Sequence, residues 1–209
     1  MKVPGNPNKQ IWLNYSRKEV QCPFVVLSSK LAKRYSGLLQ ILKDLEIAIK
    51  AINTLLNAPK NKNFDILKHG LFCLSITSYA KCFVSTTGRI KLDSSKYISN
   101  ADNQHLEMHN MIMNLRHKYI SHAENTEYDQ IEIVLALDPD LNKKEIANIV
   151  SISVYATEAN SYLHSKFIAL YTHIHAQIRQ EADKCYKALR AEVENKPIEY
   201  WYKHATYPS

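Results

Sequence analysis

Arg116 and His122 are the residues of this chain whose types and spacing could carry out a reaction. Arginine is a permanent cation with a planar fork of donors that matches phosphate oxygens. Histidine has an unperturbed pKa of about 6.5, so it can give or take a proton near neutral pH. The two residues have five others between them. Together they supply two needs of RNA cleavage without a metal ion: an acid or base, and a cation beside the negatively charged phosphorane.

A helix from about residue 100 to His122 is expected to carry both residues, because Leu106, Ile112 and Leu115 recur at helical steps. Six steps of about 100° place the two Cα atoms roughly 120° apart around an ideal α-helix. A long arginine side chain can reach round the helix, so both groups could line one cleft, but the spacing does not require it. The alternative is that Arg116 pairs or caps at the surface and His122 is a helix-terminal histidine.

The composition is typical of a helical globular protein of one medium domain, with or without an appendage. The chain has 209 residues, of which 45% are hydrophobic and 22% charged, with only 4 glycines and 7 prolines. Its formal net charge of +7 favours encounters with nucleic acid or anionic surfaces, although an ordinary basic protein would also have it.

The four cysteines, Cys22, Cys73, Cys82 and Cys185, form no C-x-x-C pair. They indicate free thiols of a reducing compartment rather than a disulfide framework. The N-terminus has no apolar signal core, and no run of 18 apolar residues occurs. We therefore expect a cytoplasmic protein without a membrane partner.

The elements are expected in the following order. Residues 1–30 form an irregular lead with short extended pieces. Helices are predicted over 31–56, 65–84, 100–122 and 158–194, and residues 85–92 form a basic loop between the second and third. Two runs rich in β-branched residues, separated by an Asp-Pro-Asp turn signal, predict a β-hairpin at about 130–155. The helical domain thus spans 31–195, followed by an aromatic tail over 196–209.

The segment 115–124, with His117 directly after the arginine, resembles the motif of the HEPN superfamily, an arginine and a histidine separated by four to six residues. The likeness is closest to the AbiU2-like branch, and it rests on residues 78–83, 88–92 and 113–124 and on the order of the elements. The resemblance implies a mainly α fold, a HEPN-like helical bundle with a small β-hairpin insert. One position departs from the family: Glu124 stands where toxins neutralised by nucleotidyltransferases often carry tyrosine.

The resemblance also implies roles for individual residues. His122 would act as acid or base at the 2′-hydroxyl, Arg116 would hold the phosphate, and His117 would orient the backbone or Arg116. HEPN ribonucleases commonly act as dimers in which two motifs face one cleft, so a homodimer is expected, with the third and the final helix at its interface.

Four cations near the motif are candidates for substrate binding: Lys81, Arg89, Lys91 and Lys118. They could guide phosphates toward Arg116, or they could simply belong to a solvated surface. His105 and His109, at i and i+4, could bind a metal ion, but no third ligand is evident, so neither a metal nor a cofactor is expected.

Two functions from different classes follow. The first is a metal-independent HEPN-type endoribonuclease, a toxin or phage-defence effector with a possible antitoxin or regulatory partner. It would cut RNA by 2′-hydroxyl attack. The second is a non-catalytic helical dimer that binds RNA or a partner protein.

Overall fold

The computed structural model describes residues 2–3, 6–10, 16–17, 20–59, 65–98, 103–121, 129–140, 145–155 and 161–207. Chain contacts group them into two compact units, one formed by residues 1–36 and 183–209 and the other by residues 37–182. The expected domain boundaries stay a prediction. No helix in the described part of the chain combines the length and the apolar character needed to cross a membrane.

The fold is mainly helical, as the sequence predicts. The helices are α1 (Lys30–Leu56), α2 (Asp65–Lys81), α3 (Ser94–Tyr97), α4 (Asn103–Asn114), α5 (Ser161–Glu194) and α6 (Ile198–Lys203). A π-helical segment, η2 (Leu115–Ser121), continues directly from α4. The expected third helix is therefore wrong in detail, because it changes its hydrogen-bond pattern at Leu115, one residue before Arg116.

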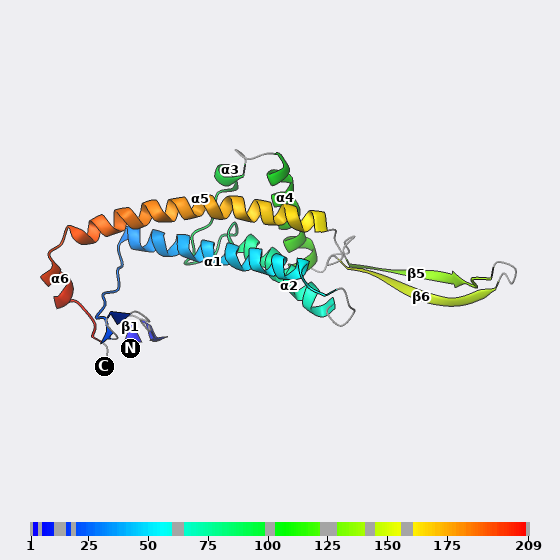
Figure 1. The fold of residues 1–209 in the computed structure, drawn as a ribbon, viewed down its shortest axis with the longest axis horizontal. Helices are drawn as coiled ribbons and strands as arrows, with labels where there is room; N and C mark the ends of the chain where they lie inside the picture. Colours follow the sequence, from blue (N-terminus) through cyan, green and yellow to red (C-terminus); the bar gives the residue numbers. More distant parts are fainter. Residues whose placement is uncertain are drawn as a thin grey trace. The chain divides into compact units, whose positions relative to one another are not determined.

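The core of the larger unit lies between α1, α2, α4 and α5. Within this unit α1 and α5 run side by side in opposite directions (Figure 1). Their apolar residues recur every three or four positions, which places them on one face of each helix. The largest fully buried side chains come from all four helices and from Ile98 after α3: Ile41, Leu45, Ile52, Phe72, Ile76, Tyr79, Ile98, Ile112, Phe167, Leu170, Tyr171 and Ile174.

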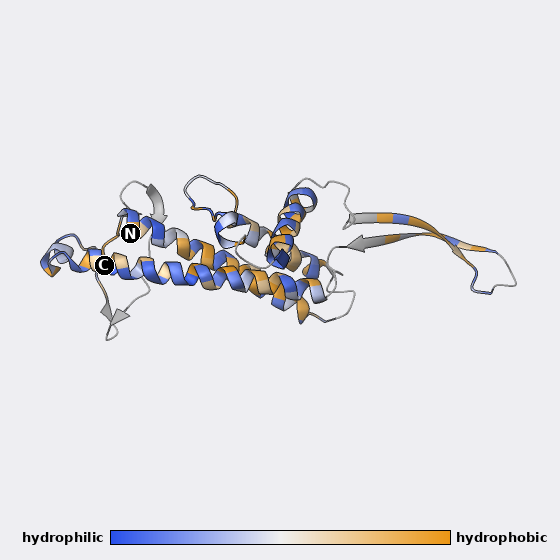
Figure 2. Cartoon of the chain, turned by 90° about the horizontal axis from the view of Figure 1, so that it is seen from above, coloured by the Kyte–Doolittle hydropathy of each residue, from blue (hydrophilic) through white to orange (hydrophobic). Residues whose placement is uncertain are grey.

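A two-stranded antiparallel hairpin, β5 (Asp129–Leu137) and β6 (Ile146–Tyr155), confirms the predicted insert. Residues that face each other include Ile133 with Ser151 and Leu135 with Ile149, and the register shifts once, between Ala136 and Leu137. Apolar colouring runs along both strands in Figure 2.

The smaller unit contains short strand pairs and the chain end. β1 (Lys2–Val3) pairs with β2 (Asn6–Gln10), and β3 (Ser16–Arg17) pairs with β4 (Val20–Gln21). The lead therefore contains the short extended pieces that were expected. Phe24 and Thr206 exchange backbone hydrogen bonds at 3.0 and 2.8 Å, and Trp201 donates its indole N–H to the carbonyl of Val193 at 3.0 Å. The aromatic tail thus packs on its own unit, in part as helix α6.

Candidate functional site

Arg116 lies in the first turn of the π-helical segment and is half-buried. Leu115, immediately before it, is only 3% exposed and anchors the segment in the core. His117 and Lys118, immediately after it, are exposed. The local structure therefore holds Arg116 between core and solvent, a position from which a charged side chain can reach a ligand. Segments of π-helix occur frequently at functional sites in other proteins.

Arg116 borders a cavity of about 270 Å³. The lining residues come from three parts of the chain that are far apart in sequence: α2, the loop after it, and the π-helical segment. They are Thr77, Lys81, Val84, Thr86, Arg89 and Arg116. Most of the exposed lining surface is apolar, but three of the six residues are cations, so an anion would be bound at their charged ends.

Helix α2 contributes Thr77 and Lys81, which lie four residues apart and so share one face of the helix. The Thr77 hydroxyl donates to the carbonyl of Cys73, which leaves its oxygen lone pairs, not its proton, for a further partner. Lys81, in the last turn, is exposed. Among the described residues neither Lys81 nor Arg116 has an ion pair, so both charges remain available to a ligand.

The loop between α2 and α3 contributes Thr86 and Arg89 through a closed turn. Gly88 has φ = 81°, a left-handed conformation that strains residues with a Cβ. The amide of Arg89 donates to the carbonyl of Thr86 at 3.4 Å, and the amide of Leu92 donates to the carbonyl of Cys82 at 2.7 Å. The second bond closes the base of the loop, so the guanidinium of Arg89 is presented from a constrained backbone.

Asp44 of α1 holds the Arg89 guanidinium through a charge-assisted hydrogen bond to Nη2. The Asp44 side chain is 12% exposed and that of Arg89 is 31% exposed, so the pair is shielded but reaches the cavity. The Nε atom of Arg89 is buried and has no hydrogen-bond partner among the described residues. A buried unpaired donor is costly, and an anionic oxygen would satisfy it.

A buried pair, Tyr79 and His109, fixes α4 against α2 and therefore fixes Arg116 against Lys81. The Tyr79 hydroxyl and His109 Nδ1 are hydrogen-bonded at 2.8 Å. Burial raises the pKa of Tyr79 and lowers the pKa of His109, so both are held neutral, as a hydrogen bond away from water requires. Tyr79 also stacks on Tyr171 of α5 with ring centroids 4.8 Å apart.

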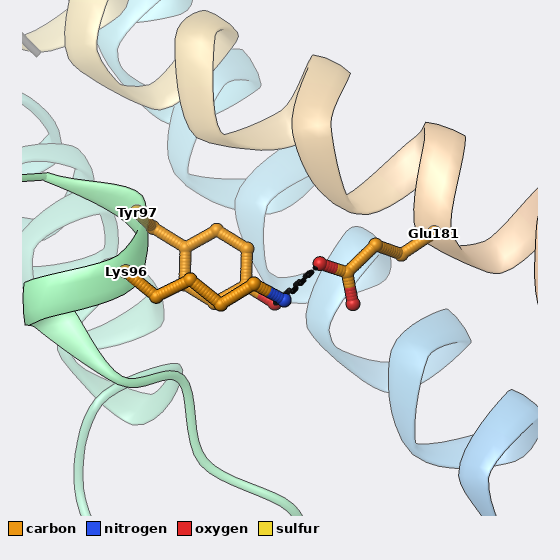
Figure 3. Close-up of polar contacts among 3 residues, drawn as sticks. All are labelled: Lys96, Tyr97 and Glu181. Atoms are coloured by element: carbon orange, nitrogen blue, oxygen red, sulfur yellow. Dashed lines mark hydrogen bonds and ion pairs between the residues drawn. The ribbon is translucent and has the colours of Figure 1, made fainter. Parts of the chain in front are cut away.

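The far end of the same loop is fastened to α5 by three residues that meet in Figure 3. Lys96 donates to a carboxylate oxygen of Glu181. The Tyr97 hydroxyl donates to the same oxygen at 2.9 Å. The side chain of Asp93 caps α3 by accepting from the amide of Ser95 at 3.0 Å. The loop that carries Arg89 is thus tied down on both sides.

The other residues predicted for the site are not among the described lining of the cavity. His122 lies outside the described residues, so its prediction stays a prediction. His117, Lys118 and Lys91 are exposed and do not belong to the described lining of the cavity. The lining of the cavity therefore contains Arg116, Lys81 and Arg89, whereas Lys91 and Lys118 are not among its described residues.

The two histidines considered as metal ligands, His105 and His109, each contact a different residue of another helix. His109 bonds to Tyr79, whereas the His105 ring stacks on His173 of α5 with centroids 4.8 Å apart. Among the described residues, no three histidine, cysteine or acidic side chains are arranged to hold a metal ion.

Reasoning from the sequence missed Thr77, Thr86 and Asp44. The i, i+4 spacing of Thr77 and Lys81 was a usable signal. The pairing of Asp44 with Arg89 joins residues 45 positions apart, and no local pattern indicates it. Chemically, the assembled cavity can bind an anion and stabilise negative charge on it.

Comparison with protein-family models, with curated proteins and with solved structures finds no match to this chain. The resemblance to the HEPN superfamily therefore remains a prediction that rests on the motif.

Proposed function

We propose that this chain is a metal-independent endoribonuclease of HEPN type and that the cavity beside Arg116 binds the scissile phosphate of RNA. One observation carries the proposal: the motif arginine shares a cavity with Lys81 and Arg89, which reach it from other elements. Among the described residues, the one carboxylate paired with any of these three cations is that of Asp44, which pairs with Arg89. The cavity therefore keeps an excess of positive charge of about +2, which favours a phosphate.

In this mechanism Arg116 donates to the phosphate oxygens and stabilises the charge that develops on the phosphorane. Such preorganised donors commonly contribute about 10²–10³-fold to the rate. Lys81 adds a point charge from the end of α2, and Arg89 adds a second from the loop after it. The ion pair with Asp44 holds the Arg89 guanidinium in one position, so this cation does not rotate freely beside the substrate.

His122 supplies a proton transfer in the proposal, either as the base that takes the proton from the 2′-hydroxyl or as the acid that protonates the leaving 5′-oxygen, and His117 orients the backbone or Arg116. The products would be a 2′,3′-cyclic phosphate and a 5′-hydroxyl, and DNA would resist because it lacks the 2′-hydroxyl. The resemblance further supports a homodimer that works as a cytoplasmic toxin or phage-defence effector, with a possible antitoxin or regulatory partner.

A second function, binding of RNA or a partner protein without cleavage, has a specific observation in its favour. The described lining consists of lysine, arginine, threonine and valine side chains. None of these residue types ordinarily exchanges a proton near neutral pH. The lining alone therefore binds an anion but offers no acid or base.

Single-turnover cleavage of a labelled single-stranded RNA in excess chelator tests the proposal. Wild type should cleave, His122→Ala should lose the activity, and Arg116→Ala should cleave about 10²–10³-fold more slowly. Arg190→Ala is the matched control, because Arg190 is an exposed arginine of α5 that pairs with Glu194. It should retain full activity.

Two results would overturn the nuclease assignment. One is undiminished cleavage by His122→Ala, which would trace the activity to another group or to a contaminant. The other is tight RNA binding by a wild-type protein that never cleaves, which would establish the binding function instead.

A further inference from the structure

The hairpin of β5 and β6 carries an aliphatic face whose described side chains are largely exposed to water. Residues directly opposite each other in an antiparallel pair point to the same face. Six side chains on one face are each between 52% and 68% exposed: Ile131, Ile133, Leu135, Leu137, Ile146 and Ile149. Ser151 lies on the same face opposite Ile133, so no charge interrupts the face among the side chains that the structure describes.

The opposite face of the hairpin differs. It combines Glu132 and Asn148 with Val134, Ala136, Val150 and Ile152. Of these, Val150 is 37% exposed and Ile152 is 49% exposed. The asymmetry matters because scattered surface aliphatic residues are ordinary, whereas a contiguous uncharged aliphatic face marks an interaction surface. A two-stranded hairpin is also only marginally stable by itself in water, so a partner on this face would stabilise it.

We infer that the aliphatic face is a homodimerisation surface, on which the same face of a second copy of this chain stacks. The face is self-complementary: a twofold axis would set isoleucine and leucine against isoleucine and leucine and would bury no unpaired charge. RNA fits it poorly, since the side chains described on this face offer neither cations for phosphate nor aromatic rings for bases.

The area of the face agrees with what a dimer needs. At roughly 100 Å² of apolar area for each aliphatic side chain, exposed fractions of 52–68% leave about 400 Å² in water. Two copies would therefore bury about 800 Å² of apolar surface. Because homodimer interfaces are about 65% apolar, this corresponds to roughly 1,200 Å² in total, which reaches the range of stable specific interfaces.

Two hairpins that stack face to face would cover the exposed aliphatic side chains, whereas two hairpins that pair edge to edge would not. Both β5 and β6 are edge strands with unpaired backbone groups. Joining two hairpins at an edge would satisfy those groups but would leave Ile133, Leu135 and Ile149 in water. Stacked sheets lie about 10 Å apart with their side chains interdigitated, and this arrangement removes the six aliphatic side chains from water.

The test is sedimentation of the full-length chain across the micromolar range, and it does not depend on nuclease activity. Wild type should be a dimer. Ile133→Glu should weaken self-association by about 100-fold or more, because twofold symmetry places two uncompensated carboxylates in one interface. Val150→Glu is the matched control, since it makes the same kind of change on the opposite face and should leave the dimer intact.

Ile149→Glu is the second variant. It alters the same face from the other strand, and far-UV circular dichroism reports whether each variant keeps its fold. The inference is overturned if the wild type is a monomer at tens of micromolar. It is also overturned if Ile133→Glu and Ile149→Glu remain dimers, or if Val150→Glu dissociates as readily. A monomeric wild type that binds phospholipid vesicles through Ile133 would equally overturn it and would identify a membrane as the occupant.

Discussion

The salt dependence of RNA binding tests the anionic ligand proposed for the cavity. Each phosphate that a protein cation neutralises releases counterions. For single strands, the slope of log affinity against log salt becomes more negative by about 0.7 for each contact. Three cations and one carboxylate leave the cavity a net charge of about +2, enough to neutralise the scissile phosphate and one neighbouring phosphate, so it should contribute about −1.4 to that slope.

Lys81→Ala and Arg116→Ala should each flatten the slope by about 0.7, a roughly fivefold relative change in affinity across a tenfold range of salt. Asp44→Asn should act in the opposite direction, because it raises the net charge of the cavity by one and should steepen the slope by about 0.7. Lys91→Ala is the control, since it removes an exposed lysine outside the described lining and should leave the slope unchanged.

Asp44→Asn should also destabilise the fold by about 1–3 kcal/mol. The side chains of Asp44 and Arg89 are 12% and 31% exposed, which places the pair between exposed pairs, worth less than about 1 kcal/mol, and buried pairs, whose disruption costs about 3–5 kcal/mol. Tighter RNA binding by a less stable protein is a combination that a general loss of structure does not produce.

Fluorescence anisotropy of a labelled 2′-O-methyl RNA measures these affinities without cleavage, because this RNA has no free 2′-hydroxyl. The reasoning is refuted if Lys91→Ala and Lys81→Ala flatten the slope equally. In that case the chain binds RNA through its overall charge. It is also refuted if folded Asp44→Asn binds RNA more weakly than wild type.

Two further predictions concern stability. Gly88→Ala should cost about 1 kcal/mol, because φ is 81° although a new Cβ would meet no atom within 4 Å. In Gly70→Ala, inside α2, a new Cβ would also meet no atom within 4 Å, and this change should stabilise the fold by about 0.5–1 kcal/mol. Thermal unfolding measures both variants, and the argument is contradicted if Gly88→Ala and Gly70→Ala shift the stability in the same direction. Burial lowers the pKa of His109 and His164, so the unfolded chain binds more protons and stability should fall as pH drops below about 6.5. Denaturant titrations should show that the free energy of unfolding depends less on pH in His164→Leu than in His204→Leu, a control at an exposed site. Equal pH dependence in the two variants would contradict the role of His164.

The helices could be predicted because their apolar residues repeat at helical steps. The repeat from Leu31 to Leu56 corresponds to α1, and the one that begins at Asp65 corresponds to α2, which ends at Lys81 rather than at Val84. The hairpin followed from β-branched runs on either side of a turn signal. These are local signals, and each depends on a few neighbouring residues.

The π-helical segment could not be predicted, because α- and π-helices accept the same residue types and differ only in which carbonyl each amide reaches. The cavity escaped prediction for a different reason. Its composition depends on the packing of α2 against α4 through Tyr79 and His109, a contact between residues 30 positions apart. Both Lys81 and Lys118 were predicted as binding residues; Lys81 lines the cavity, whereas Lys118 is exposed and is not among the described lining residues.

Binding and cleavage at this site should respond to different variables, and this separates the two proposed functions. The described lining holds cations, hydroxyls and a valine, and side chains of these types ordinarily do not titrate between about pH 5 and 8. RNA affinity should therefore follow salt and change little with pH. A nuclease that uses His122 needs a group that changes protonation near pH 6.5 as well. If the single-turnover rate follows one such ionisation while affinity stays constant, the proton transfer belongs to a histidine and not to the cavity. If rate and affinity both follow salt alone, the cavity binds RNA and the motif does not cut it.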